Sequence, residues 1–472
     1  MPWIIIIYFS IQLCIRLLIS SNLEVDDSEM VGQIHWALGY SNSHPPLYHW
    51  IVRICYDLFG YWPAATAVPK CLLLTVAFLL IYDAARRVTE STIAGAVAVV
   101  FFFLIPTIFW RSQAKMTHSI LGVAATAATL QALVLVLRRP RASAFAWLGL
   151  ALSIGLLAKY NFVFVIIALA IAVLCVPDVR RIFAQRAALL AIVIPVVLSL
   201  PHWLWVRSHL DLALQNLYLL RVPGGPLPLP MSERSIWKGL WTLAVTIVLS
   251  LAPTLLVCVG ALSLFRSGRT IEKSEPASAR QMQRVLGWML LAELAVFAVA
   301  VVAGKFYQVH ERYLVVLLPP FPLWLLLRSR AYQRTKSTAA ILFVGLWIAV
   351  VMTVLRPLSV FTGHSRLAFP WAEIAHDVAK VAGPATQIVS DHREFSVNTA
   401  IRVSSLASAD EPTATQVILI ARDPTSVSRL GKRFSNYMPA GEMRTIEARL
   451  HGRSDRIAKL AVQRWQQRGD RH

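Results

Sequence analysis

The chain has 472 residues, of which 57% are hydrophobic and 15% charged, and its mean hydropathy is +0.58. A soluble globular domain carries about 25% charged residues, so this composition excludes that class and indicates a polytopic helical membrane protein. The formal net charge of +21 would suggest a nucleic-acid partner in a soluble protein, but here the arginines gather in short loops between apolar runs. The positive-inside rule produces that distribution, so no nucleic-acid partner is expected.

Apolar runs of about 16 to 20 residues, long enough to cross the hydrocarbon core of a bilayer, recur from the N-terminus onward. We predict about eleven spans on this basis. They are expected at residues 3–20, 64–82, 93–109, 117–137, 143–158, 161–176, 187–206, 236–264, 285–303, 313–327 and 338–356. The first run lacks a basic segment before it and a clear small-residue cleavage site, so it is predicted to be an anchoring helix.

Loop charge predicts the orientation of these spans. One alternating set of loops carries the arginine groups, at residues 86–87, 138–141, 180–186, 266–284 and 328–336. The other set has fewer Arg and Lys residues and more His, Trp, Tyr and acidic residues. Because basic loops face the cytoplasm, the N-terminus is predicted inside, and the segment after the first span, Lys159 and the C-terminus are predicted outside.

The chain changes character after residue 356, where the apolar runs shorten. Residues 1–356 are therefore predicted to form the transmembrane domain, with a first outer loop at 21–63, and residues 357–472 a small periplasmic α/β domain with a frayed basic tail. Strands are predicted at 387–390 and 415–420 and a helix at 371–381. The loop at 209–237 contains a run of prolines and glycines at 223–230, which fits either a mobile flap or an ordered connector.

The first outer loop is the part of the sequence that points most directly to function. An acidic segment, Glu24-Val-Asp-Asp27, is followed by His44-Pro-Pro-Leu-Tyr48. Carboxylates at a membrane boundary cost free energy unless function retains them. Two adjacent prolines fix the backbone, so His44 and Tyr48 are held in a defined geometry. The segment is predicted to form one wall of a catalytic cleft that faces water.

Four pieces of this loop, in order, carry a family resemblance: Glu24-Val-Asp-Asp27, Trp36-Ala-Leu-Gly-Tyr40, His44-Pro-Pro-Leu-Tyr48 and Asp57-Leu-Phe-Gly60. They resemble the first outer loop of the GT-C family of integral-membrane glycosyltransferases. The nearest branch is family 39/83-like and includes bacterial aminoarabinose and galacturonosyl transferases and protein mannosyltransferases. Further segments that match in order are Trp110 to His118, Leu157 to Phe162, Pro201 to Trp203 and Glu311 to Pro320.

The resemblance implies a GT-C fold in a bacterial inner membrane and a multi-pass enzyme whose active site faces the periplasm. It implies transfer of a sugar from a polyprenyl-phosphate donor to an acceptor, which is lipopolysaccharide core, lipid A or another envelope glycan. A protein hydroxyl, as in protein O-mannosyltransferases, is an alternative acceptor. Membrane lipids are the other expected partner, and the sequence assigns neither a divalent metal nor an oligomeric state. No metal-ligand spacing among the cysteines and no phosphate-cradling glycine loop is found.

The resemblance also assigns roles to residues. Asp26 takes the position of the family's catalytic aspartate, while Asp27 replaces the usual glutamate, so Asp26 is expected to be the general base and Asp27 the runner-up. Lys159, Arg312 and Lys305 are expected to bind the donor phosphate, since cations must neutralise this leaving group.

The residues expected to bind substrate are His44, Tyr48, His118 and His310. For the histidines within apolar runs, a hydrogen-bonded core position is an equally good interpretation. A transporter or flippase of lipid-linked sugars is the competing function, but it should place ionisable groups near the membrane midplane on several broken helices. Here the polar motifs gather at one predicted face, which favours the enzyme.

Overall fold

The structure is a computed structural model, and it describes residues 1–40, 44–213, 235–265, 276–304, 306–383, 385–403, 405–409, 412–449 and 457–468. The chain divides into two compact units, which are described separately. The bundle unit comprises Met1–Ile11, Trp36–Ile51 and Val68–Val350. The sheet unit comprises Gln12–His35, Val52–Ala67 and Val351–His472.

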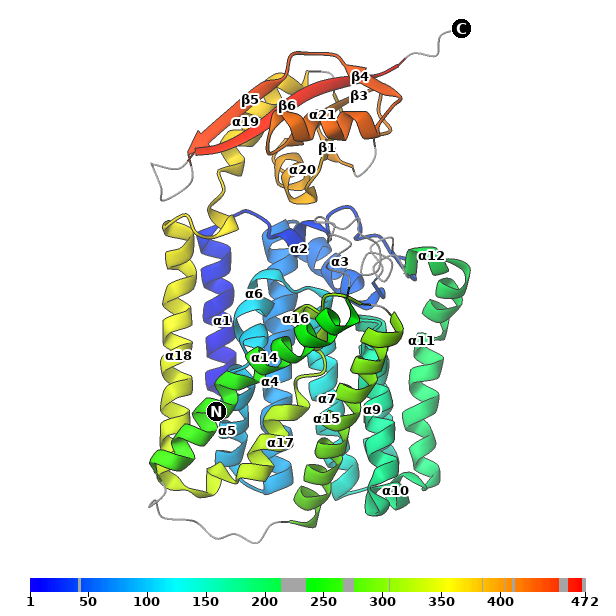
Figure 1. Ribbon diagram of the computed structural model, residues 1–472, viewed down its shortest axis with the longest axis vertical. Coiled ribbons are helices and arrows are strands. Elements are labelled where there is room, and N and C mark those ends of the chain that lie inside the picture. The colour runs from blue at the N-terminus through cyan, green and yellow to red at the C-terminus, as the bar shows by residue number, and fades with distance from the viewer. Residues whose placement is uncertain are drawn as a thin grey trace. The chain divides into compact units, whose positions relative to one another are not determined.

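Apolar helices account for most of the bundle unit (Figure 1). The helices that lie in it wholly or partly are α1 (Pro2–Ile19), α3 (Leu47–Phe59), α4 (Trp62–Thr89), α5 (Thr92–Phe103), η1 (Thr107–Arg111), α6 (Ser112–Lys115), α7 (His118–Arg138), α8 (Ala142–Ala158), α9 (Phe162–Cys175), α10 (Pro177–Phe183), η2 (Arg186–Leu189), α11 (Leu190–Ser208), α12 (Leu210–Ala213), α14 (Ile236–Leu264), α15 (Ala277–Gly304), α16 (Glu311–Leu314), α17 (Pro320–Ser329), η4 (Ala331–Gln333) and α18 (Thr335–Phe361).

Every predicted span overlaps one of these helices, so the helical membrane fold is confirmed. Within the described residues, seven helices are long and apolar enough to cross a membrane, or eight if the pair α9 and α10, bent by 111°, counts as one span. The helices α5 and α8 are apolar but shorter, and α17 has 10 residues. The number of eleven spans therefore stays a prediction.

The central helix of the bundle unit is α7, and 94% of its membrane-spanning window is buried within the protein. Small residues allow this burial. A Cβ atom added at Gly122 would lie 2.8 Å from Val316 Cγ2, and the Thr126 hydroxyl donates to the Val316 carbonyl at 2.8 Å. Small and hydroxyl residues let backbones approach closely in membrane helices. The segment that follows α16 is thereby held against α7.

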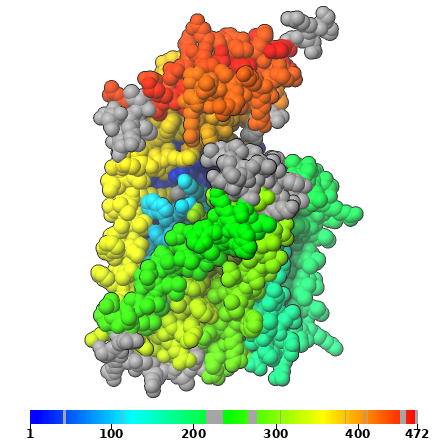
Figure 2. Space-filling view, viewed as in Figure 1, coloured from blue at the N-terminus to red at the C-terminus, as the bar shows by residue number. Residues whose placement is uncertain are grey.

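The lipid-facing surface of the bundle unit is made of large apolar side chains. Figure 2 shows α14 crossing the bundle obliquely, and α14 packs on α15. Trp237 and Trp241, near the N-terminal end of α14, are 79% and 69% exposed. Exposed tryptophans at one end of an apolar helix are typical of the membrane interface.

A mixed sheet forms the C-terminal part of the sheet unit, as predicted (Figure 1). Its strands are β1 (Gln387–Ser390), β2 (Ala407–Ser408), β3 (Gln416–Ala421), β4 (Tyr437–Pro439), β5 (Arg444–Arg449) and β6 (Ile457–Gln467). The order is β2-β1-β3-β6-β4, with β5 also paired to β6. Strands β2, β1 and β3 are mutually parallel, and β6 is antiparallel to β3, β4 and β5.

Alternation along the strands assigns the helices of this unit to the two faces of the sheet. Ile418 and Ile420 of β3 pack with α19 (Trp371–Ala382) and with Phe395 of α20 (Arg393–Ala400). Val417 and Leu419 pack on the opposite face with α21 (Pro424–Arg433). Both faces are covered, which explains the continuous apolar run of β3.

The predicted strands at 387–390 and 415–420 and the helix at 371–381 are confirmed to within a residue at each end. The strand β6, which is a central strand of the sheet, was not predicted, and the frayed basic tail stays a prediction because residues 469–472 lie outside the described residues. The sequence pattern did not predict β6 because Lys459 interrupts its apolar residues. Lys459 lies directly opposite Glu447 of β5, and their side chains form an ion pair at 2.6 Å. An opposite-charge cross-strand pair is compatible with a strand.

Candidate active site

Lys159 lies at the junction of α8 and α9, in an extended conformation directly after Ala158. Its side chain is 8% exposed. The ammonium group donates to the Ser119 hydroxyl at 2.6 Å and to the Arg312 carbonyl at 2.8 Å. A buried charge must be hydrogen-bonded to be tolerated, and these two acceptors belong to the first turn of α7 and to α16. Lys159 therefore connects three segments that are far apart in the sequence.

Arg312 and Tyr313 of α16 surround this ammonium group. The Lys159 ammonium lies 5.9 Å from the centre of the Tyr313 ring, and so does the guanidinium of Arg312. Asn161 donates to the Tyr313 carbonyl at 2.7 Å, and the preceding Glu311 pairs with Arg111. The structure thus brings the two predicted phosphate-binding cations, Lys159 and Arg312, to one place.

A cluster of histidine and tyrosine rings is built around the start of α7. His44 stacks on His118 with ring centres 4.1 Å apart, and Tyr48 lies 5.1 Å from His118. A ring nitrogen of His118 lies 3.2 Å from one of His49, and Tyr40 stacks on His49 at 3.7 Å. Of these five, His44, Tyr48 and His118 were predicted as site residues.

Sequence reasoning missed the roles of Tyr40 and His49, although both lie in or next to the quoted loop segments. His49 follows Tyr48 directly and Tyr40 ends the Trp36 to Tyr40 segment. The sequence marked them as part of the loop, but only the fold shows that their rings stack. Ser119, Asn161 and Tyr313 were missed in the same way, since each lies within two positions of a predicted residue but contacts a different segment.

The electrostatics connect the ring cluster with the cations. Burial, assisted by the positive charges of Lys159, His49 and Arg312, lowers the pKa of His44 from the ordinary 6.5 to about 3. The ring centre of His310 lies 6.3 Å from that of Tyr313, and partial loss of hydration, followed by the charges of Arg312 and Arg111, lowers the pKa of His310 as well. Neutral imidazoles beside fixed cations form an environment that favours an anionic ligand.

The predicted carboxylates belong to the sheet unit, where they sit on the single turn α2 (Val25–Ser28). Asp26 is partly exposed, whereas Asp27 is 2% exposed. Both lie in the first turn of this helix, where the backbone N–H groups favour negative charge.

Side chains from the C-terminal part of the sheet unit hold the chain on both sides of α2. Asn398 of α20 accepts from the Leu23 N–H at 3.0 Å and donates to the Leu23 carbonyl at 3.2 Å. Arg393 donates to the Val31 carbonyl at 3.0 Å. The acidic turn is therefore bracketed by backbone contacts to α20. Sequence gave no signal for this, because Leu23 and Asn398 are 375 positions apart.

Two further predictions fall outside the described residues, namely Lys305 and the loop segment at 223–230. Within the part of the chain that the structure describes, no group of three His, Cys, Asp or Glu side chains could hold a metal ion.

The low pKa of His44 predicts a pH-dependent loss of stability. The unfolded chain binds a proton at this histidine near pH 6.5, but the folded chain does so only near pH 3. The free energy of unfolding should therefore fall as the pH drops below 6.5, by up to about 1.4 kcal/mol per pH unit for this one group. Thermal unfolding of purified His44→Gln in detergent should show a shallower decline. A matched control is His376→Gln on α19, where the histidine is exposed. Equal slopes for both variants would contradict a neutral His44 in the folded chain.

The comparisons with known proteins agree with this architecture. Residues 43–205 match the family described as dolichyl-phosphate-mannose-protein mannosyltransferase. The chain is 27% identical to the lipopolysaccharide core galacturonosyltransferase RgtB of Rhizobium johnstonii over 397 residues, which cover 81% of this chain and 77% of the relative. It is also 27% identical to RgtA of the same organism over 395 residues, with the same coverage.

Among solved structures, the fold is similar to that of ArnT from Cupriavidus metallidurans bound to undecaprenyl phosphate, with a TM-score of 0.61, 12% identity and 98% of both chains covered. At that identity the likeness concerns the fold alone. Together with the galacturonosyltransferase relatives and the family match over residues 43–205, it shows that the chain is similar to integral-membrane glycosyltransferases along most of its length.

Proposed function

We propose that the chain transfers a sugar from a polyprenyl-phosphate carrier to lipopolysaccharide core, lipid A or another envelope glycan, on the periplasmic face of a bacterial inner membrane. The observation that carries the proposal is the group formed by Lys159, Arg312 and neutral His44, which creates a local excess of positive charge. A departing polyprenyl phosphate needs such an environment. The names of the relatives support the acceptor class, and loop charge supports the face.

Lys159 and Arg312 are proposed to bind the donor phosphate. A phosphate oxygen gains most from charge-assisted hydrogen bonds in a partly desolvated site. Lys159 supplies a buried cation that its own hydrogen bonds hold in place, and Arg312 supplies an exposed guanidinium beside it. Lys305 is proposed to join them, since it lies seven positions before Arg312 in the sequence.

Asp26 is proposed to act as the general base that takes the proton of the acceptor hydroxyl. The difference in burial favours Asp26 over Asp27, because a base must be reached by the acceptor and Asp27 is almost fully buried. Asp27 is then a positioning residue of the same turn. His44, Tyr48, His118 and His310 are proposed to contact the substrates, with the rings available for stacking on a sugar.

A protein hydroxyl is the second candidate acceptor, and the description of the matched family favours it. A flippase of lipid-linked sugars is the third candidate, but it would need no general base. Mass spectrometry of lipopolysaccharide and of envelope proteins from a strain that lacks the chain separates the two acceptor classes. Loss of one sugar from the lipopolysaccharide supports the proposal, and loss from protein alone contradicts the acceptor assignment.

Asp26→Asn should abolish most of the transfer activity. It keeps the shape of the side chain but removes the proton acceptor, so the rate should fall by roughly 10²–10⁴-fold while the protein still folds. The measurement is transfer by the purified variant at saturating donor and acceptor, together with complementation of the deletion strain. Asp27→Asn is the matched comparison, and near-normal transfer by Asp26→Asn with loss in Asp27→Asn would exchange the two roles.

Asn398→Ala should slow transfer although Asn398 is proposed to touch no substrate. The change removes both hydrogen bonds to Leu23, so the turn that carries Asp26 loses its fixed position, and misplacement of a catalytic group costs roughly tenfold to 10²-fold in kcat. Asn398→Asp keeps the acceptor and should restore part of the rate. Asn436→Ala, at an exposed asparagine of the same unit, is the control. Full activity of Asn398→Ala would show that this anchor does not matter for the reaction.

Lys159→Ala should weaken donor use and leave acceptor use unchanged. A lost charge-assisted contact costs about 1.5–3 kcal/mol, which lowers donor affinity about tenfold to a hundredfold. Arg312→Lys keeps the charge but loses the planar fork, so it should retain only part of the affinity. Ser119→Ala controls for the loss of packing, since it removes one partner of Lys159 and no charge. A changed acceptor dependence with an unchanged donor dependence would assign the cations to the acceptor instead.

A further inference from the structure

A cavity of about 420 Å³ lies at the ends of α4, α5 and α7 that carry basic loops, and the proposed reaction does not use it. Four guanidinium groups line it, against a single carboxylate. The lining residues are Arg86, Arg87, Glu90, Thr92, Leu135, Arg138 and Arg139. Such an excess of cations around one hollow is expected to attract an anion. Thr92, the first residue of α5, adds the positive end of a helix dipole to the same cavity.

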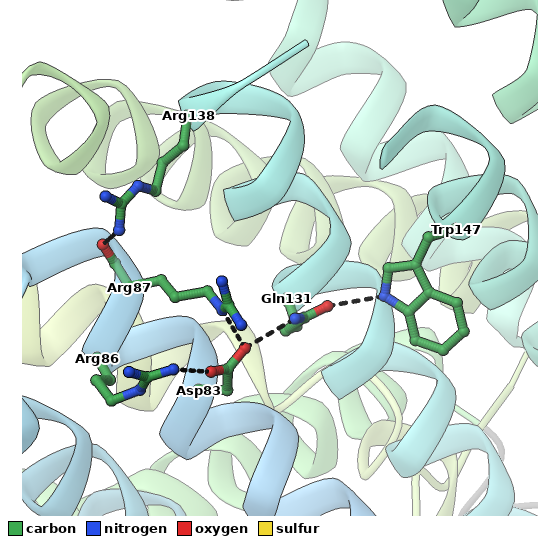
Figure 3. A network of polar contacts seen from close by, with 6 residues as sticks. All are labelled: Asp83, Arg86, Arg87, Gln131, Arg138 and Trp147. Atoms are coloured by element: carbon green, nitrogen blue, oxygen red, sulfur yellow. Dashed lines mark hydrogen bonds and ion pairs between the residues drawn. The ribbon is translucent and has the colours of Figure 1, made fainter. Parts of the chain in front are cut away.

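A polar network holds the guanidinium groups of two of the arginines, Arg86 and Arg87, in place (Figure 3). Arg86 donates to one oxygen of Asp83 at 2.7 Å, and Arg87 donates to the other at 2.5 Å. Gln131 of α7 also donates to Asp83, at 2.9 Å, and accepts from Trp147 at 2.7 Å. The carboxylate is therefore held by both α4 and α7. An anchored carboxylate orients the guanidinium groups before any ligand arrives, so less entropy is lost on binding.

The other two arginines differ from each other. Arg138 pairs with Glu90 at 2.8 Å and also donates to the Arg87 carbonyl. Glu90 occupies a left-handed backbone conformation with φ of 54°, which non-glycine residues rarely adopt and which the surrounding contacts must maintain. Arg139 is exposed and makes no ion pair with any described residue. One guanidinium in the lining is thus available to a ligand without breaking an internal pair.

A second cavity, also of about 420 Å³, shares Arg86 and Thr92 with the first. Its remaining lining is mainly apolar: Pro2, Leu79 and Tyr82, with Asp83 at its polar side. The two cavities together therefore offer a cationic part and an apolar part next to each other. A free phosphate ion would use only the cationic part, whereas an amphipathic molecule would use both.

We propose that these paired cavities bind the headgroup of an anionic phospholipid, with the phosphate among the arginines and the glycerol and upper acyl chains along Leu79 and Tyr82. Guanidinium groups bind phosphate through paired, charge-assisted hydrogen bonds. The cavities lie at the ends of membrane-spanning helices, where lipid headgroups are present at high local concentration. The arginines belong to the loops predicted to face the cytoplasm, so the site is distinct from the group around Lys159.

The test is native mass spectrometry of the purified full chain, titrated with phosphatidylglycerol or with phosphatidylcholine. Arg139→Gln should weaken phosphatidylglycerol binding by about tenfold, since it removes one charge-assisted contact. Glu90→Gln should strengthen it several-fold, because it removes the one carboxylate in the lining of the first cavity and frees Arg138. The opposite effects of these two variants on lipid binding distinguish a specific site from a loss of folding, because misfolding would weaken binding in both. Arg181→Gln on α10, an exposed arginine of another basic loop, should change nothing.

Three outcomes would overturn the proposal. Equal binding of phosphatidylglycerol and phosphatidylcholine by the unmodified chain would show that charge does not select the ligand. Displacement of the lipid by an equal concentration of inorganic phosphate would assign the cationic cavity to a free anion. An equal loss in Arg139→Gln and Arg181→Gln would reduce the effect to the overall charge of the chain.

Discussion

A buried cation, the ammonium group of Lys159, joins three segments of the bundle unit. A charge with 8% exposure among apolar helices is tolerated only where acceptors surround it, and here the acceptors come from Ser119 and from the Arg312 carbonyl. Because these belong to α7 and α16, the single side chain ties the break between α8 and α9 to both. The same contacts place the Arg312 guanidinium and the Tyr313 ring beside it. The hydrogen bonds of Lys159 thus connect these helices and also position the groups that are proposed to bind the donor phosphate.

The residues of this unit that are proposed to bind the substrates lie at helix ends rather than in helix interiors. His118 begins α7, Lys159 separates α8 from α9, and Arg312 lies on the short α16. Backbone N–H and C=O groups are unsatisfied at such ends and can be paired with side chains. The interior of α7, in contrast, is made of small and apolar residues that let its neighbours pack closely. This division gives a rigid frame with polar groups at its rim.

Side chains from the C-terminal part of the sheet unit hold the chain on both sides of the acidic turn. Asn398 bonds through its side chain to the backbone N–H and C=O of Leu23, and Arg393 donates to the backbone carbonyl of Val31 beyond the turn. Bonds to backbone atoms fix the path of the chain whatever the side chains are. A sheet covered by helices on both faces is a stiff support for such contacts.

The sequence by itself determined the class of the protein, because the length of the apolar runs and the charge of the loops follow from the solvent that a bilayer provides. It also determined the strands β1 and β3 and the family resemblance, since these are properties of contiguous residues. Contacts between distant segments were decided only by the tertiary structure. The stacking of His44 on His118, the bridge from Asn398 to Leu23 and the arginine cavity at the ends of α4 and α7 each join residues that no local pattern connects. The strand β6 could not be predicted from the sequence for the same reason, because Glu447, the partner that neutralises Lys459, lies on another strand.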